Sequence, residues 1–237
     1  MCGRIALYEG AESLARLLDA GVDPELLVGW QPHWNLGPTS EILGVAERHG
    51  KRILGAYRWG LVPSWAKDPA AVKSTFNARA ESIASKPAFE AAFRRWRILV
   101  PADLFYEWEA VGPKLKQPYA FKRADGDPIV FAGLRAWWKG EDGAELRSAT
   151  IITTRAGPDM PIHDRQPVVL ERDAWDHWLD PGVTDRDELE PLLVPSVKGT
   201  LVHYPVSRAV GSVNNDGPEL IEVARPVEDP GRLPLDG

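Results

Sequence analysis

The stretch RILVPADLFYEWE, residues 97–109, decides the fold of this chain. It holds two runs rich in β-branched and aromatic residues, 97–102 and 104–109, and such runs are typical of β-strands. Three more strands are predicted downstream, at residues 119–123, 129–138 and 148–154. Their connections carry Gly112-Pro113, Asp125-Gly126 and Asp142-Gly143, which favour tight hairpin turns between antiparallel strands.

Shorter elements are predicted on both sides of this β-rich middle. Residues 29–40 are rich in proline, glycine and aromatic residues, and we interpret them as an ordered loop. The pattern predicts one α+β domain over residues 2–224, with a mostly antiparallel, barrel-like β-sheet core and peripheral helices, and a flexible tail at 225–237. The flanking strands are expected at 3–8, 41–46, 52–57, 168–170 and 201–206, and the helices at 12–19, 86–95, 173–179, 184–193 and 219–224.

Composition narrows the class of function. A net charge of -6 over 237 residues excludes a general coat for polyanions but allows a local basic cleft. The single cysteine, Cys2, excludes an intramolecular disulfide and suits a reducing compartment. No signal pattern and no long apolar run is present, and the five histidines lack the paired spacing of metal ligands. We therefore expect a cytoplasmic monomer that needs no membrane, metal or cofactor.

Cys2 follows the initiator methionine, and a residue this small permits removal of Met1. Removal would leave an α-amine and a thiol two bonds apart, and both groups have a reactive fraction near neutral pH. Such an aminothiol can use its amine as a general base for thiol attack. It can also condense with an aldehyde and close to a five-membered thiazolidine. The ordinary alternative is a small buried cysteine that happens to lie early in the chain.

Other polar residues stand among apolar or turn residues and are candidates for chemistry. Asn77 lies in STFNARAE (residues 74–81), Glu107 stands between aromatic residues in FYEW (105–108), and His163 lies in IHDR (162–165). An imidazole can both accept and donate a proton, and a carboxylate can do general acid–base work. On the sequence alone, Asn77 could equally be a turn residue, Glu107 the wet face of a strand and His163 a structural histidine.

The motifs MCGR, RWGLVPSWAKD, FNARAES, LVPADLFYEW, TTRA, IHDRQPVVL and VSRAVGSVNNDGPELI follow one another along the chain. Taken together, they resemble one family, the SRAP or "SOS response-associated peptidase" domain, from Cys2 to about residue 224. Three positions depart from the usual pattern: Gln166 stands for a common methionine, Leu36-Gly37 for Ile/Val-Ala, and Ser82 for threonine. None of them removes a candidate for chemistry.

The resemblance implies binding of single-stranded DNA and covalent capture of abasic sites, with association with the nucleoid when bound. It implies that Cys2 forms an imine and then a thiazolidine with the sugar aldehyde. Glu107 would exchange protons at the Cys2 amine, His163 would move a proton at the sugar oxygen, and Asn77 would orient the sugar. The residues that the resemblance assigns to DNA binding are Gly3, Arg4, Pro38, Trp65, Arg79 and Thr153.

Three other functions stay open at this stage. Cys2 with Glu107 and His163 could act as a thiol peptidase or an autoprocessing hydrolase. A class II glutamine amidotransferase also starts with Met-Cys-Gly, but that family usually uses an Asn-Gly pair for its oxyanion hole, and this chain has no Asn-Gly dipeptide. The chain could also be a non-covalent reader of single-stranded or modified DNA that uses Arg4, Arg79 and Trp65.

Overall fold

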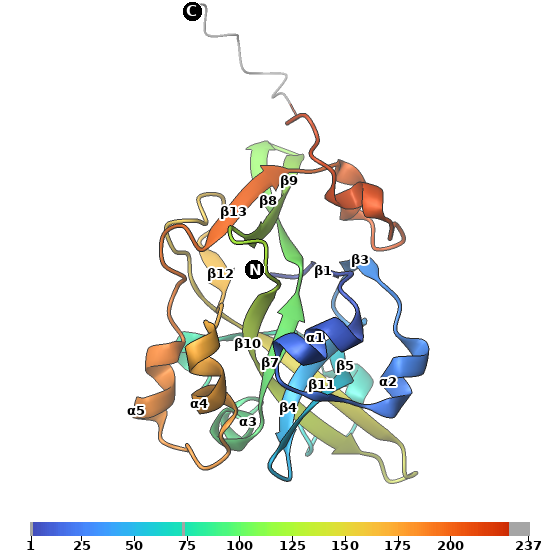
Figure 1. The fold of residues 1–237 in the computed structure, drawn as a ribbon, viewed down its shortest axis with the longest axis vertical. Coiled ribbons are helices and arrows are strands. Elements are labelled where there is room, and N and C mark those ends of the chain that lie inside the picture. Colours follow the sequence, from blue (N-terminus) through green and yellow to red (C-terminus); the bar gives the residue numbers. More distant parts are fainter. Residues whose placement is uncertain (1, 73, 228–237) are drawn as a thin grey trace, which may run out of the picture.

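Two β-sheets make up most of the molecule in the computed structural model, which describes residues 2–72 and 74–227 (Figure 1). The larger sheet runs in the order β12-β11-β10-β7-β4-β5-β2, and β6 pairs with β11 beside this path. Its strands are β2 (Gly21–Val22), β4 (Glu41–Arg48), β5 (Lys51–Trp59), β6 (Asn77–Arg79), β7 (Arg97–Ala102), β10 (Ile129–Lys139), β11 (Glu145–Arg155) and β12 (Arg165–Pro167).

Five strands of this sheet close into a barrel, because β11 pairs with β5 as well as with β10. The β11–β5 pairing is parallel, with Ser148 opposite Arg58, whereas the other four pairings around the barrel are antiparallel. Close approach of strands requires glycine at one point: a Cβ on Gly133 would lie 2.8 Å from the carbonyl oxygen of Thr150.

The smaller sheet is antiparallel throughout, in the order β13-β9-β8-β1-β3. Its side chains alternate between two cores: Phe105 belongs to the main core, whereas Leu104 and Tyr106 pack with Val210 and Leu220 of the C-terminal segment. Because both faces are covered, β8 begins with an unbroken apolar run. The strands are β1 (Ile5–Leu7), β3 (His33–Leu36), β8 (Leu104–Gly112), β9 (Leu115–Arg123) and β13 (Leu201–Pro205).

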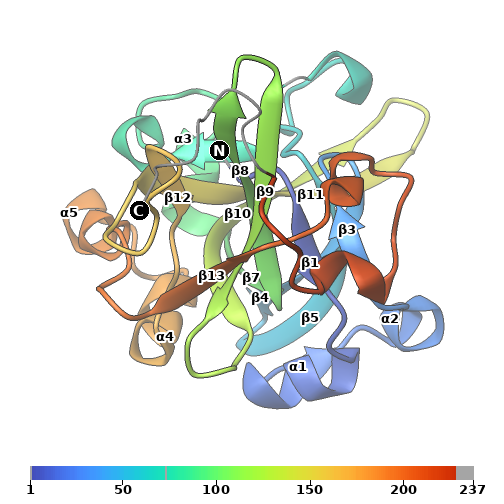
Figure 2. The same cartoon turned by 90° about the horizontal axis from the view of Figure 1, so that it is seen from above.

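Short helices surround the sheets, with α1 and α2 on one side of the barrel and α3, α4 and α5 on the other (Figures 1 and 2). Within the described residues, no helix has the length and apolar character needed to cross a bilayer. The α-helices are α1 (Ala11–Leu17), α2 (Pro24–Gly29), α3 (Glu90–Arg95), α4 (Trp175–Leu179) and α5 (Arg186–Leu189). The 3₁₀ turns are Pro69–Ala71, Ala80–Ser82, Arg172–Ala174, Glu190–Leu192, Arg208–Gly211 and Pro218–Ile221.

This architecture confirms the expected single α+β domain with a mostly antiparallel, barrel-like core. The flexible tail at 225–237 stays a prediction, because residues 228–237 lie outside the described part of the chain. Residues 225–227 of the predicted tail are described, and the backbone N–H of Val227 donates a hydrogen bond of 2.7 Å to Gln117 Oε1.

Some local expectations were wrong. The segment 29–40 is not only a loop, since it contains β3, in which Leu36 pairs with Ile5 and His33 with Leu7. This strand depends on a partner distant in the sequence, which composition does not reveal. The strand expected at 168–170 occurs instead as β12 followed by a single bridge from Val169 to Phe131. Helix α2 was not expected. The helix expected at 184–193 is present as α5 followed by a 3₁₀ turn, whereas the one expected at 219–224 is only a short 3₁₀ turn.

Candidate active site

Cys2 lies just before β1, has no exposed surface, and is held by Asn77. The Asn77 Nδ2 donates a hydrogen bond of 2.6 Å to the carbonyl oxygen of Cys2. Asn77 begins β6, and the parallel register of β6 with β11 sets it opposite Ile151. Its other amide atom, Oδ1, is buried and accepts no hydrogen bond within the described residues. A hydrogen-bond acceptor is therefore available beside Cys2.

Glu107 reaches the same place from β8, the strand that neighbours β1. Ile5 pairs with Phe105, and extending this antiparallel register sets Gly3 opposite Glu107. Glu107 is buried. Burial raises the pKa of the Cys2 thiol well above its ordinary value, and the charge of Glu107 raises it further. The thiol is therefore protonated at neutral pH.

His163 and Thr153 are joined through Arg165, the first residue of β12. The backbone N–H of Arg165 donates to His163 Nδ1 at 3.0 Å, and its Nη2 donates to the carbonyl oxygen of Thr153 at 2.8 Å. Because an N–H can only donate, Nδ1 of the neutral imidazole is the acceptor and Nε2 carries the proton. Asp164 Oδ1 lies 2.8 Å from the same Nδ1.

Arg165 also forms a two-pronged contact with Glu81, with distances of 3.1 and 2.9 Å between guanidinium and carboxylate. The hydrogen bonds from Arg165 are the main cause that lowers the pKa of Glu81. Arg165 was not among the residues predicted from the sequence. Its place in the IHDR motif is the only sequence signal for it, and only the fold joins Glu81 and Thr153 to it.

Hydrogen bonds to other parts of the chain fix the side chain of Arg4. Its Nη1 donates to Asn35 Oδ1 at 2.8 Å and to the carbonyl oxygen of Val210 at 2.7 Å, and the guanidinium lies 5.7 Å from the ring centroid of Trp108. Burial lowers the pKa of Arg4. Asn35, also missed by the sequence analysis, fixes this arrangement, because its Nδ2 donates to the carbonyl oxygens of Val210, Ser212 and Asn215.

Arg79, Gly3 and Pro38 lie near these groups. Arg79 is exposed at the end of β6, next to β11. Gly3 and Pro38 are half-buried. Pro38 follows Gly37, where an added Cβ would lie 3.6 Å from Arg4 Nε, so this turn passes beside the arginine. That distance is an ordinary van der Waals contact, and the tighter neighbour of such a Cβ would be Val213 Cγ1 at 3.2 Å.

Trp65 is set apart from this group, in an apolar pocket of about 320 Å³. Trp137, on the same pocket, pairs with Arg147 of β11, six residues before Thr153 (153 − 147). At ~3.3 Å per residue this is roughly 20 Å along the strand. We call this site the tryptophan pocket; its defining residues are Trp65, Trp96, Trp137, Arg135, Pro63 and Pro87.

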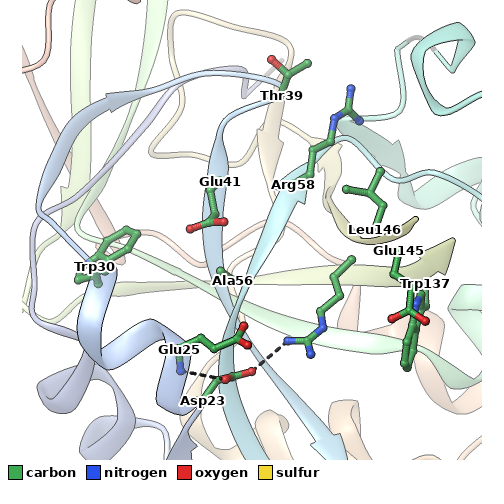
Figure 3. Close-up of a pocket in the computed structure, with 12 residues that line it drawn as sticks. Asp23, Glu25, Trp30, Thr39, Glu41, Ala56, Arg58, Trp137, Glu145 and Leu146 are labelled. Carbon is green, nitrogen blue, oxygen red and sulfur yellow. Dashed lines mark hydrogen bonds and ion pairs between the residues drawn. The ribbon is translucent and has the colours of Figure 1, made fainter. Parts of the chain in front are cut away.

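A second hollow, the polar cleft, has a volume of about 600 Å³ and lies where β5 meets β11 (Figure 3). Figure 3 shows Asp23, Glu25 and Glu41 on one side and Glu145 on the other. Arg147 crosses to Asp23, with 3.0 Å between Nη1 and Oδ2, and lowers its pKa against the opposing effect of burial. In residues 2–72 and 74–227, no cluster of three or more acidic, histidine or cysteine side chains is suited to hold a metal.

Gln166 stands where methionine was expected, and the interior is adapted to its amide. Gln166 is fully buried, its Oε1 accepts from the backbone N–H of Gly157 at 2.6 Å, and its Nε2 donates to Ser196 Oγ at 3.0 Å. Both ends of the amide are satisfied, so the substitution costs no unpaired polar group. Gln166 fastens β12, and with it the segment that carries His163, to the loop at Ser196.

The fold and the site define a single-domain α+β protein with a buried cysteine close to the start of the described chain. Asn77 and the charge of Glu107 act directly on that cysteine. The chain belongs to the SRAP family: the family model described as "SOS response associated peptidase (SRAP)" matches residues 1–213.

Its relatives are similar over most of their length. The chain is 38% identical over 224 residues to "Abasic site processing protein YoqW" of Bacillus subtilis, which covers 94% of this chain and 99% of the relative. It is 32% identical over 226 residues to YedK of Escherichia coli, with 94% and 99% covered. It is 34% identical over 263 residues to HMCES of Gallus gallus, with 93% and 77% covered. Both carry the same "Abasic site processing protein" description.

Solved structures share the fold. A protein from Bacteroides thetaiotaomicron superposes with a TM-score of 0.84 at 21% identity, over 94% of this chain and all of that one. A protein from Bordetella bronchiseptica gives a TM-score of 0.73 at 25% identity, over 87% and 100%.

Proposed function

We propose that this protein binds single-stranded DNA and captures abasic sites covalently through Cys2. The observation that carries the proposal is the convergence of three residues far apart in the sequence. Asn77 bonds the Cys2 carbonyl at 2.6 Å, and the charge of Glu107 acts on the Cys2 thiol. Relatives described as abasic site processing proteins support the choice of substrate.

In the proposed reaction, the Cys2 α-amine, freed of any preceding residue, attacks the aldehyde of the opened abasic sugar. An imine forms and one water leaves. The thiol then adds across the C=N bond, with sulfur bonding to carbon and its proton passing to nitrogen, which gives a thiazolidine. The adduct therefore has the summed mass of its parts less one water. Because the ring contains no imine, the strand is protected from the β-elimination that an imine invites.

The state of the thiol supports this order of steps. Burial and Glu107 raise the pKa of the Cys2 thiol, so little thiolate exists at neutral pH. Attack by a preformed thiolate is therefore disfavoured, and a thiol peptidase reaction would need the Cys2 amine as general base in its first step. Attack by the amine needs no ionised thiol, and the S–H can supply both sulfur and proton in the second step. This favours capture over peptide hydrolysis.

Three side chains are assigned to the chemistry around Cys2. Asn77 Oδ1, a buried acceptor, would accept a hydrogen bond from the sugar or the amine. Glu107 would take a proton from the attacking amine and return it to the departing water. His163 would move a proton at the ring oxygen as the sugar opens, with Nε2 as the atom that faces the substrate, because Arg165 occupies Nδ1.

The strand itself would lie along the charged residues near Cys2. Arg4, held by Asn35, and the exposed Arg79 would bind phosphates on either side of the lesion. Gly3 and Thr153 would lie along the sugar, and Pro38 would pack against it. Trp65 would stack on a base farther along the strand.

Intact-mass spectrometry tests the proposal. Protein whose first residue is Cys2 is mixed with single-stranded DNA that carries one abasic site. We expect a heat-stable adduct whose mass is the sum of the two less one water, and no stable adduct from Cys2→Ala. Cys2→Ala and Cys2→Ser both keep the α-amine and lose the thiol, so any imine adduct that they form should persist only after reduction with borohydride. An equally heat-stable adduct from Cys2→Ala would exclude the proposed role of Cys2.

A further inference from the structure

Trp65, Trp96 and Trp137 are the tryptophans with strongly exposed side chains in residues 2–72 and 74–227, and all three line the tryptophan pocket. Their exposed fractions are 66%, 50% and 57%. Large aromatic side chains left in water on one small surface usually mark a binding site. The proposed function uses only Trp65, so the other two are unexplained by it.

The pocket is held rigidly by three parts of the chain. The backbone N–H of Arg135 in β10 donates to the carbonyl oxygen of Trp96 at 2.7 Å, which fixes the end of α3 against the barrel. The Trp138 Nε1 donates to the carbonyl oxygen of Ala66 at 2.6 Å, which fixes the loop that carries Trp65. Stacking surfaces that are already in place lose little entropy when a flat ligand binds.

The charges around the tryptophan pocket indicate which kind of flat ligand it would bind. The tryptophan pocket has no carboxylate in its wall, and its one charged side chain, Arg135, lies 4.9 Å from the ring centroid of Trp96. The neighbouring polar cleft, which shares Trp137, has four carboxylates in its wall against two arginines, Arg58 and Arg147, so its charge is negative on balance. An anionic chain would be repelled by the polar cleft but accepted by the tryptophan pocket. Aromatic faces beside an arginine are typical of sites that stack the bases of single strands.

We propose that the tryptophan pocket is a second DNA subsite, in which Trp96 and Trp137 receive an unpaired base of the strand whose abasic site is held at Cys2. This inference rests on the proposed function for the position of the strand. The roughly 20 Å along β11 between Thr153 and Arg147, the residue that pairs with Trp137, corresponds to about six nucleotides at the 3.4 Å spacing of a stacked strand. An extended strand covers the distance with fewer.

Fluorescence of 2-aminopurine tests the inference without the covalent reaction. The base is placed at successive positions on either side of a tetrahydrofuran abasic analogue, which has no aldehyde. We expect quenching on one side only, within about six nucleotides of the analogue. Trp96→Ala should remove the quenching and weaken binding of long oligonucleotides by about five-fold or more. Oligonucleotides that end before the pocket should bind Trp96→Ala and the parent protein equally.

Matched variants keep the test decisive. Trp96→Phe retains an aromatic face and should retain the quenching, and Val197→Ala removes an exposed apolar side chain elsewhere and should change nothing. Quenching that persists in both Trp96→Ala and Trp137→Ala would overturn the inference, as would an equal loss of affinity for short and long strands. If the proposed capture fails instead, aldehyde-bearing DNA gives no adduct while the dependence on oligonucleotide length remains.

Discussion

The surroundings of Cys2 and the tryptophan pocket contrast in nearly every physical property. Cys2, Asn77 and Glu107 are buried, and hydrogen bonds and charge connect them. Trp65 and Trp96 are exposed, and their pocket is apolar apart from one arginine and a serine. The first region can change the protonation and reactivity of groups, because burial shifts their pKa values. The second can only bind, by stacking and by excluding water.

The contrast teaches that capture and affinity can be separated in this molecule. Substitutions near Cys2 should change the rate or durability of the adduct and leave binding to intact DNA nearly unaltered. Substitutions in the tryptophan pocket should do the reverse. The polar cleft provides a third region for comparison, because it lies next to the pocket but has the charge that DNA avoids.

Among variants that keep Cys2, the largest effect is expected from Asn77→Ala. This change removes the hydrogen bond to the Cys2 carbonyl and the buried acceptor Oδ1. Capture of abasic DNA should slow by roughly 10²-fold or more, the usual loss when a preorganised polar group is removed from a reaction site. Single-turnover adduct formation measures the rate. Binding of intact single-stranded DNA should stay within about two-fold, and the exposed Asn214→Ala is the control. A wild-type rate in Asn77→Ala would remove the distinction between the two regions.

Gln166→Met, which restores the expected family residue, should destabilise this protein. It would leave the backbone N–H of Gly157 and the hydroxyl of Ser196 without their partners in the interior. The free energy of unfolding should fall by about 1–3 kcal/mol, as measured by urea denaturation. The double variant with Ser196→Ala should recover part of the loss. Unchanged stability in the single variant would show that another group satisfies Gly157.

Alkaline pH should weaken the fold through the Cys2 thiol. Its pKa is raised in the folded state, so above about pH 8.5 the unfolded chain loses this proton while the folded chain keeps it. The free energy of unfolding should therefore fall as pH rises, by about 1–2 kcal/mol between pH 8.5 and 10. Cys2→Ala removes this contribution. Its free energy of unfolding, measured by urea denaturation across that pH range, should therefore change less with pH. An identical slope for both proteins would contradict the assigned burial effect.

The smallest effect is expected in the polar cleft. Glu41→Gln removes one of its carboxylates without changing the tryptophan pocket. Affinity for intact single-stranded DNA should rise by less than about two-fold. Glu41 lies in the neighbouring cleft and not in the tryptophan pocket, and a solvent-accessible charge away from the strand is largely screened at physiological salt. Fluorescence anisotropy at low and high salt measures this affinity. A large gain would mean that the strand passes over the polar cleft and not through the tryptophan pocket.

Tertiary contacts explain why some site residues could not be predicted. Asn35 lies in a stretch whose composition indicates a loop, yet it anchors Arg4 because β3 pairs with β1 and the C-terminal segment covers that sheet. Arg165 was visible only as part of a motif, and its bonds to Thr153 and Glu81 cross 12 and 84 residues of sequence. Such contacts depend on register and packing, and no local pattern records them.

The amino-acid sequence alone determined the type of most central elements, because β-branched and aromatic runs and turn residues act locally. It also determined the unique cysteine and the motifs that identify the family. The folded chain decided that β11 returns to β5 and closes the barrel, that Asn77 holds Cys2, and that three tryptophans face one pocket. These features join residues distant along the chain, and their free energies depend on which side chains exclude water together.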